Sequence, residues 1–191
     1  MKKINYLWVI FALTLASFFY DKKLITLISY SRVSLLDSFM AWISNPLTTI
    51  LLFAIITLLL FREKRKRDWI LPLWLIILST WVSIGIIKFI VGRIRPFEAL
   101  TLPLVKGASY SFSAWNASFP SMHAAGAFAM IPVINKFFPR LKWFWIILSV
   151  VMAMSRLYLG VHYLSDIIVG ATIGVLISKG IITSKEKRLK K

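Results

Sequence analysis

The sequence predicts an all-α, polytopic membrane protein with six transmembrane helices and one short helix at the membrane interface. Of its 191 residues, 59% are hydrophobic and 15% are aromatic, a composition too apolar for an ordinary soluble domain. Apolar runs of about 20 residues, the length needed to cross a bilayer, recur along the chain. Lysine and arginine gather between these runs, as they do in the connecting segments of membrane proteins.

The predicted spans follow one another with short connections and occupy residues 4–20, 43–61, 69–91, 119–138, 143–159 and 163–182. Between the first two lies DKKLITLISYSRVSLLDSF, residues 21–39, whose mixed polarity and helical spacing of apolar residues predict an interfacial helix. The sequence contains no internal repeat, low-complexity linker or second domain, so we expect a single domain over residues 1–191.

The first span has an alternative interpretation. Its MKK start, its apolar run and the small residues of LAS also resemble a secretory signal peptide. The run is long, however, and the residues that follow it are bulky, unlike those around a cleavage site. We therefore expect the first span to be retained.

The net charge of +17 is distributed as in a membrane protein rather than a nucleic-acid-binding module, which needs a basic face on a soluble fold. Most of the 24 lysine and arginine residues lie in four segments, 1–3, 62–68, 136–142 and 179–191. Positively charged connections mark the cytoplasmic side. We expect a multi-pass protein of the inner (cytoplasmic) membrane, with both termini in the cytoplasm, bilayer lipids around it and no nucleic-acid partner.

The absence of cysteine excludes a disulfide framework, a thiolate metal site and a cysteine nucleophile. Polar residues instead form three clusters at the outer ends of the predicted spans. In KFIVGRIRP, Lys88 and Arg95 are seven residues apart and could share one helix face. Pro96 disfavours helical geometry at Arg95, so we expect the helix that forms the third span to end there. Alone, such cations usually extend toward lipid headgroups.

The second cluster, SFPSMHAAGAF, opens the fourth span. Pro120 suits the first helical position, with Ser118 or a neighbour as the cap, and Ser121 and His123 then fall in the first turn. Free backbone amides and the positive end of the helix dipole favour an anion there. The alternative is a capped helix with an interfacial histidine.

The third cluster, SRLYLGVHYLSD, joins the fifth span to the sixth. Arg156 closes the fifth span, and His162 opens the sixth with Asp166 on the same face one turn later. An imidazole that donates one N–H to a carboxylate is fixed in tautomer, so its other nitrogen becomes a better nucleophile or base. A structural histidine–aspartate pair is the alternative.

Together the three clusters provide what a dianionic phosphate requires. They combine three cations, neutral donors and both histidines of the chain at a similar depth. Cations and donors can stabilise the equatorial oxygens, while one histidine attacks phosphorus and the other donates a proton. This chemistry needs no metal, so we predict no metal ligand and no cofactor.

These residues resemble a known signature. KFIVGRIRP reads K-x6-R-P, PSMH resembles P-S-G-H, and SRLYLGVHYLSD fits S-R-x5-H-x3-D. The sequence is similar to the type 2 phosphatidic acid phosphatase (PAP2) family of integral membrane lipid phosphatases. The resemblance implies a PAP2-type six-helix bundle that hydrolyses a phosphomonoester or diphosphate headgroup at the outer, periplasmic face.

The resemblance also implies residue roles. His162 would attack phosphorus and carry a phosphohistidine, oriented by Asp166, while His123 would protonate the leaving oxygen and then activate water. The phosphoryl oxygens would be held by Lys88, Arg95, Ser121, Arg156 and the backbone amide of Met122. Met122 stands where the family has glycine, and we expect its amide still to face the phosphate.

The substrate class stays open between several lipids. Small bacterial members of the family act on undecaprenyl diphosphate, lipid A 1-phosphate or phosphatidylglycerol phosphate; we favour the first two, with the third as the alternative. Further candidate contacts with the lipid headgroup lie in the 97–119 loop, namely Lys106, Tyr110, Phe112 and Trp115, although aromatic residues there more often form only the interfacial belt. Lys22, Lys23 and Arg32 are candidates to meet a second negative group. Other protein classes to test are a cytochrome with two histidine haem ligands, a metal hydrolase, and a non-catalytic PAP2-fold protein or transporter.

Overall fold

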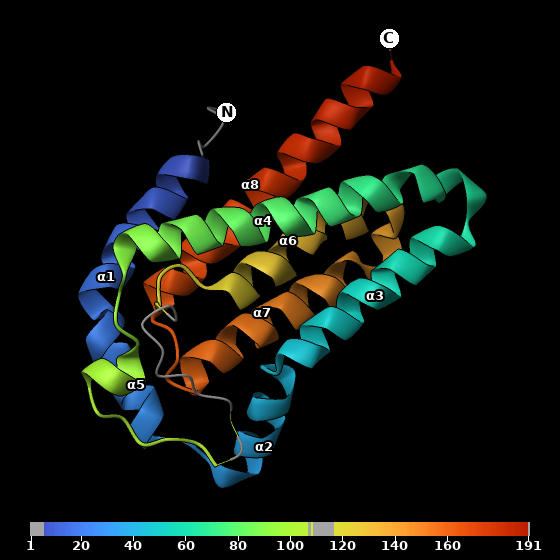
Figure 1. Ribbon diagram of the computed structural model, residues 1–191. Coiled ribbons are helices and arrows are strands. Elements are labelled where there is room, and N and C mark those ends of the chain that lie inside the picture. The colour runs from blue at the N-terminus through green and yellow to red at the C-terminus, as the bar shows by residue number, and fades with distance from the viewer. Residues whose placement is uncertain (1–5, 107, 109–116, 191) are drawn as a thin grey trace, which may run out of the picture.

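A computed structural model describes residues 6–106, 108 and 117–190, and within these ranges the regular structure is entirely helical (Figure 1). The elements in chain order are α1 (Tyr6–Tyr30), α2 (Ser34–Ile43), α3 (Pro46–Arg62), η1 (Lys64–Trp69), α4 (Ile70–Val91), α5 (Pro96–Ala99), α6 (Met122–Phe137), η2 (Pro139–Leu141), α7 (Lys142–Tyr158) and α8 (Leu164–Leu189), where η denotes a 3₁₀ helix. The all-α class predicted from composition is confirmed.

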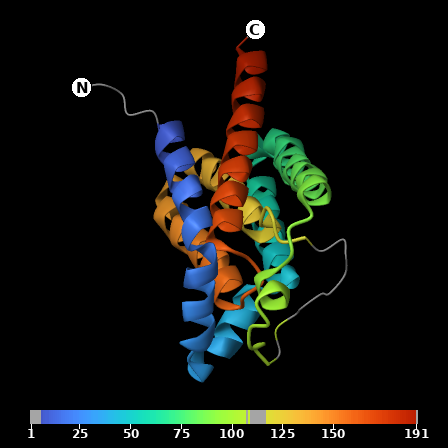
Figure 2. The ribbon, with the colours of Figure 1, turned by 90° about the vertical axis from the view of Figure 1, so that its left-hand side faces the viewer.

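Helix α6 is the centre of the arrangement, and it packs most extensively on α8, then on α7 and α4. Figure 1 shows the end of α4, the start of α6 and the start of α8 on the same side of the bundle. In Figure 2, α1 and α8 run alongside each other, both termini lie at one end, and α2 lies at the other. The segments that carry the three polar clusters therefore meet away from the chain ends.

Each predicted span corresponds to a helix, namely α1, α3, α4, α6, α7 and α8. Within the described residues, three helical stretches are long and apolar enough to cross a membrane: Lys64–Ala99, Pro139–Tyr158 and Leu164–Leu189. A fourth is added if α2 and α3, which meet at a bend of 50°, form one broken span. With 17 and 16 residues, α3 and α6 are shorter than a typical span, so six transmembrane helices stay a prediction.

The stretch predicted as one interfacial helix, residues 21–39, is divided differently. Its first part continues α1 as far as Tyr30, and its second part begins the separate helix α2. The charged residue Asp21 was expected to mark the end of an apolar span, but its side chain is only 1% exposed. The helix continues through Asp21, whose carboxylate is satisfied by Arg93, in the segment after α4, and by Ser165 of α8.

Buried apolar side chains form two main clusters among the described residues. One joins α3, α4, α6 and α8 and includes Ile56, Leu60, Ile76, Met130 and Ile134. The other lies beneath the polar end of the bundle and includes Ile25, Phe97, Leu157, Val161 and Ile167. Many large apolar side chains also point outward, among them Phe19 and Ile90, which are 86% and 74% exposed. Such a surface is typical of contact with lipid, since soluble proteins rarely expose large apolar patches.

Two glycines allow α6 and α8 to approach closely. A Cβ atom at Gly170 would lie 2.4 Å from the carbonyl oxygen of Ser121, and one at Gly174 would lie 2.1 Å from that of Ala125. Both distances are far shorter than a van der Waals contact. This Gly-x-x-x-Gly spacing, common where membrane helices pack closely, sets the separation between the starts of α6 and α8.

We expect Gly170→Ala and Gly174→Ala to destabilise the protein by about 1–3 kcal/mol each, because the added methyl group must displace backbone atoms of α6. Melting temperatures in detergent measure the effect. Gly180→Ala is the matched control, because a Cβ atom there meets nothing within 4 Å. Equal melting temperatures for all three variants would contradict the close contact.

Candidate active site

The three polar clusters lie together at the end of the bundle where α4 ends and α6 and α8 begin (Figure 1). Hydrogen bonds connect them directly. The Nζ atom of Lys88 donates to the carbonyl oxygen of Ser118 at 3.3 Å, and Nη1 of Arg95 donates to that of Val161 at 3.0 Å. The backbone N–H of Ser121 donates to the backbone oxygen of Asp166 at 2.9 Å. These contacts fix the three clusters relative to one another.

Lys88 and Arg95 reach this region from different structures rather than from one helix face. Lys88 lies in the last turn of α4, which ends at Val91. Gly92 caps the helix in the left-handed conformation, with φ of 58°, and donates to the Lys88 carbonyl. Arg95 is therefore extended and outside the helix. The expectation that the helix continues to Arg95 is wrong, because Gly92 terminates α4 after Val91, the residue at which the third span is predicted to end.

The start of α6 also differs from the expectation. Ser121, expected in the first turn, is the N-cap, and its hydroxyl accepts a hydrogen bond from the backbone N–H of Ala124. The helix therefore begins at Met122, not at Pro120. The amides of Met122 and His123 belong to the first turn, whose N–H groups have no acceptor inside a helix. They can donate to an anion, as the sequence suggested.

His162 precedes α8 instead of opening it, because Tyr163 is the N-cap and the helix begins at Leu164. Its Nδ1 atom lies 3.5 Å from Oδ2 of Asp166, longer than an ordinary hydrogen bond. That carboxylate oxygen accepts from the backbone N–H of Tyr163 at 2.8 Å and from the hydroxyl of Ser118. Ring and carboxylate are thus adjacent, at a distance that a small movement would close.

Burial lowers the pKa of His162 well below its ordinary value, since its side chain is only 2% exposed. The positive charges of Arg95, Arg156 and Lys88 lower this pKa further, and a hydrogen bond with the backbone of Ser118 raises it in part. The imidazole is therefore neutral at pH 7. A neutral ring keeps the lone pair that a nucleophile needs.

Arg156, at the end of α7, is buried and turned toward α2. Its Nη1 atom donates to the backbone oxygen of Ser44 at 3.1 Å and also to the Ser44 hydroxyl. Ser44 is the C-cap of α2. The short helix that precedes α3 therefore helps to place one of the three cations of the site.

Two charged residues that sequence reasoning missed, Arg93 and Asp21, join this group. Nη1 of Arg93 donates to Oδ1 of Asp166 at 2.6 Å and to the hydroxyl of Ser165 at 2.7 Å, while Nη2 donates to Oδ2 of Asp21 at 2.8 Å. Asp21 also accepts from the backbone N–H of Ser165 at 3.0 Å. The available signal was the charge itself, because an ionisable residue within an apolar segment requires a partner.

The residues predicted to contact the lipid headgroup differ in whether their side chains are exposed or already hydrogen-bonded within the protein. Lys22, Lys23 and Lys106 are exposed. Arg32 already donates from Nε to the backbone oxygen of Tyr158 at 2.7 Å and from Nη1 to that of Pro103 at 2.5 Å. The remaining candidates, Tyr110, Phe112 and Trp115, lie outside the described residues. Within the described ranges, no three His, Cys, Asp or Glu side chains are grouped as metal ligands.

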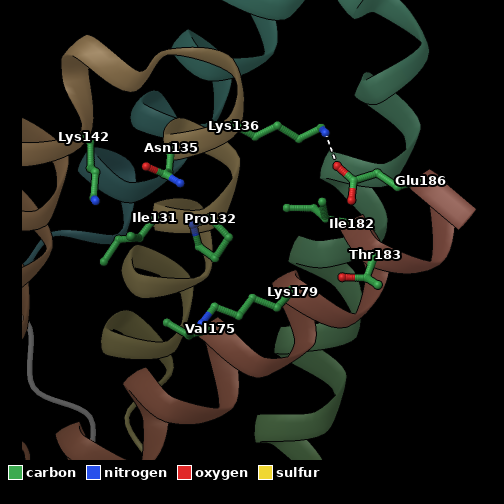
Figure 3. A pocket seen from close by; sticks show the side chains of 10 residues that line it. All are labelled: Ile131, Pro132, Asn135, Lys136, Lys142, Val175, Lys179, Ile182, Thr183 and Glu186. Carbon is green, nitrogen blue, oxygen red and sulfur yellow. Dashed lines mark hydrogen bonds and ion pairs between the residues drawn. The ribbon is translucent and has the colours of Figure 1, made fainter. Parts of the chain in front are cut away.

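A separate hollow of about 490 Å³ lies between α6 and α8, near the start of α7 (Figure 3). Its lining includes Lys136 and Glu186, which form an ion pair. The apolar residues Ile131, Val175 and Ile182 also line it. None of the predicted site residues lines it, so the candidate active site is a different region of the molecule.

Known proteins resemble this chain in sequence and in fold. An undecaprenyl-diphosphatase of Sulfolobus acidocaldarius is 26% identical over 173 residues, which cover 83% of this chain and 75% of that protein. A lipid A 4′-phosphatase of Porphyromonas gingivalis is 26% identical over 149 residues, covering 75% of this chain and 63% of that protein. The crystal structure of a transmembrane PAP2 type phosphatidylglycerolphosphate phosphatase from Bacillus subtilis shares the fold, with a TM-score of 0.73 and 21% identity over 94% of this chain and 95% of that one.

The family comparison agrees with the motifs. The family model described as the PAP2 superfamily matches residues 68–190, a segment that holds all three polar clusters. That segment covers more than half of the chain, and the outward-facing apolar helices are those of a membrane protein. The chain belongs to the PAP2 superfamily, a family of membrane lipid phosphatases.

Proposed function

We propose that this protein hydrolyses a phosphomonoester or diphosphate headgroup of a membrane lipid through a phosphohistidine intermediate, without a metal ion. The observation that carries the proposal is the buried imidazole of His162, whose Nδ1 lies 3.5 Å from the carboxylate of Asp166 and whose surroundings include the cations of Lys88, Arg95 and Arg156. A neutral nucleophile beside fixed positive charge suits attack on a dianionic phosphate, whose own charge would repel an anionic nucleophile.

The proposed reaction has two steps. Nε2 of His162 forms a bond to phosphorus as the bond to the lipid oxygen breaks, and His123, which enters this step as the imidazolium, gives that oxygen its proton and becomes neutral. His123 then removes a proton from water, which attacks phosphorus and releases inorganic phosphate and neutral His162. Nε2 of His123 is buried and has no hydrogen-bond partner within the described ranges, which fits a group awaiting the leaving oxygen. Asp166 stabilises the positive ring of the intermediate.

The phosphoryl oxygens are proposed to be held by donors that surround the ring. Charge develops on these oxygens in the transition state, and cations placed in advance stabilise it without rearrangement. The amide of Met122 contributes from the first turn of α6, where the helix dipole adds to the attraction. The proposed oxygen ligands are Lys88, Arg95, Ser121, Arg156 and the Met122 amide.

For the substrate we favour undecaprenyl diphosphate or a lipid A phosphate. The undecaprenyl-diphosphatase and lipid A 4′-phosphatase relatives support this choice, because each aligns with three quarters or more of this chain. Phosphatidylglycerol phosphate is the alternative, supported by the likeness in fold. Exposed lysines on α1, Lys22 and Lys23, are proposed to meet a second negative group of the headgroup.

We further propose that the chain acts as one domain in the inner membrane, with the site facing the periplasm. The two termini lie at the same end of the bundle, which is consistent with an even number of crossings (Figure 2). The positively charged segments 62–68 and 179–191 then face the cytoplasm, as positive connections do.

We expect His162→Ala to abolish phosphate release and the acid-labile phosphoenzyme, because the nucleophile is gone. His123→Ala should reduce kcat by about 10²–10⁴-fold, the usual contribution of a general acid or base. Purified protein in detergent, with melting temperatures checked, provides the assay. Full activity of His162→Ala would refute the mechanism, and loss of wild-type activity with a chelator would refute its metal independence.

The pH dependence follows from the neutral ring. Since burial holds the pKa of His162 well below its ordinary value, most of the rings stay unprotonated as the pH is lowered from 7.5 to 6.5. We expect kcat/KM to fall only at lower pH, where protonation removes the nucleophile. Because a phosphomonoester titrates near pH 6, the profile is measured with both a monoester and a diphosphate lipid. A shared midpoint at or above pH 6.5 would contradict the assignment.

The double variant Lys22→Gln/Lys23→Gln tests the second-charge hypothesis. Each lysine near an anionic group contributes about 1 kcal/mol, so we expect loss of both to raise KM by up to about 30-fold with little change in kcat. The measurement compares undecaprenyl diphosphate, lipid A 1-phosphate and phosphatidylglycerol phosphate, and the largest effect indicates the best-matched headgroup. Lys187→Gln/Lys190→Gln, exposed near the C-terminus, is the control. Unchanged KM for all three lipids would refute the hypothesis.

A further inference from the structure

Arg93 connects two buried carboxylates at the candidate active site. Its guanidinium donates to Asp166 at 2.6 Å and to Asp21 at 2.8 Å, and these aspartates are 0% and 1% exposed. The same guanidinium carbon lies 3.9 Å from the ring centre of Tyr163, the N-cap of α8. Arg93 is one of the variable positions of the K-x6-R-P pattern, and the mechanism above assigns it no role.

The two oxygens of Asp166 have different partners. Oδ1 accepts from Arg93, whereas Oδ2 accepts from Ser118 and from the backbone N–H of Tyr163 and is the oxygen nearest to Nδ1 of His162. A carboxylate can rotate about its terminal bond, so the strong charged contact at Oδ1 also determines where Oδ2 points. Arg93 is thus placed to control the oxygen that faces the proposed nucleophile.

Asp21 in turn holds Arg93. It lies on α1, accepts from Arg93, and accepts from both the backbone N–H and the hydroxyl of Ser165. Without Asp21, the positive charge of Arg93 would interact with Asp166 and no longer be shared between the two carboxylates. Without Arg93, two buried carboxylates would face each other with no shared cation, which is strongly unfavourable.

We propose that Asp21 and Arg93 are positioning residues, in which Asp21 holds Arg93 and Arg93 holds Oδ1 of Asp166 so that Oδ2 faces the ring of His162. This inference rests on the proposed function, because it assumes that His162 is the nucleophile. Helix α1 precedes the matched segment 68–190, yet it supplies Asp21 to the site. The first helix is therefore part of the catalytic apparatus as well as of the membrane-embedded structure.

The test is a double-mutant cycle with Asp21→Asn, Arg93→Gln and both together. We expect Asp21→Asn to lower kcat on the order of 10-fold, as loss of an outer partner typically does, with KM nearly unchanged. Arg93→Gln should lower kcat more, and the double variant should recover part of that loss because it no longer leaves Asp21 facing Asp166. Arg93→Lys keeps the positive charge but loses the bidentate contact, so its kcat should lie between those of the wild type and Arg93→Gln.

The acid limb of the pH profile is the range in which kcat/KM falls as His162 is protonated. Its position distinguishes a positioning role of Asp21 and Arg93 from a purely stabilising one. In Asp21→Asn, Arg93 offsets more of the negative charge near His162, so the limb should move to lower pH. In Arg93→Gln, the negative charge of Asp166 is no longer offset by Arg93, so the acid limb should move to higher pH. The charged and titratable groups that face His162 directly are unchanged in these variants: Lys88 from α4, Arg95 beside α5, His123 from α6, Arg156 from α7 and Asp166 from α8.

Matched controls are Glu63→Gln and Arg140→Gln, which remove exposed charges away from the site. Melting temperatures identify any variant that does not fold. Asparagine is nearly identical in shape to aspartate, so the kcat and the acid limb of Asp21→Asn then show whether Asp21 has a positioning role. The inference is overturned if His162→Ala is inactive but Asp21→Asn and Arg93→Lys keep wild-type kcat and pH limbs. Full activity of His162→Ala would instead overturn the proposed function itself.

Discussion

The arrangement of the polar end of this protein depends on the buried carboxylate of Asp166. Its side chain accepts from the hydroxyl of Ser118, the backbone N–H of Tyr163 and the guanidinium of Arg93, and its backbone oxygen accepts from Ser121. These partners come from the segment after α4, the approach to α6 and the start of α8. A buried charge is stable only when several donors satisfy it, so one carboxylate holds together three segments distant in sequence.

The close contact between α6 and α8 lies at the same end of the bundle as the charged residues. Gly170 and Gly174 allow α8 to approach the backbone of α6, which places the backbone N–H of Ser121 against the backbone oxygen of Asp166. Around this rigid contact lie the cations of Lys88, Arg95 and Arg156, together with N–H groups at the start of a helix. Such a concentration of positive charge attracts an anion. A phosphate dianion is such an anion, and its binding is strongest where negative charge increases during reaction.

Sequence reasoning was most successful for features that depend on local pattern. Long apolar runs predicted the helices, and the spacing within three motifs selected polar residues that the structure places at one end of the bundle. It was less successful for helix boundaries: Gly92 ends α4 before Arg95, and Ser121 and Tyr163 are caps ahead of α6 and α8. Boundaries depend on which side chain satisfies the free backbone groups, and several neighbouring residues could have done so.

The sequence by itself determined the helical membrane class, the family and the set of candidate site residues, because run lengths and motif spacings are properties of short segments. Only the tertiary structure decided that Asp21 and Arg93 belong to the same group. Their side chains are joined across 72 residues, and Asp21 contacts Ser165 across 144. In sequence, Asp21 resembles the polar end of a span, since its charge alone does not identify its partner. The packing of α1 against α8 places Asp21 beside Ser165, and the segment after α4 brings Arg93 to the same carboxylate.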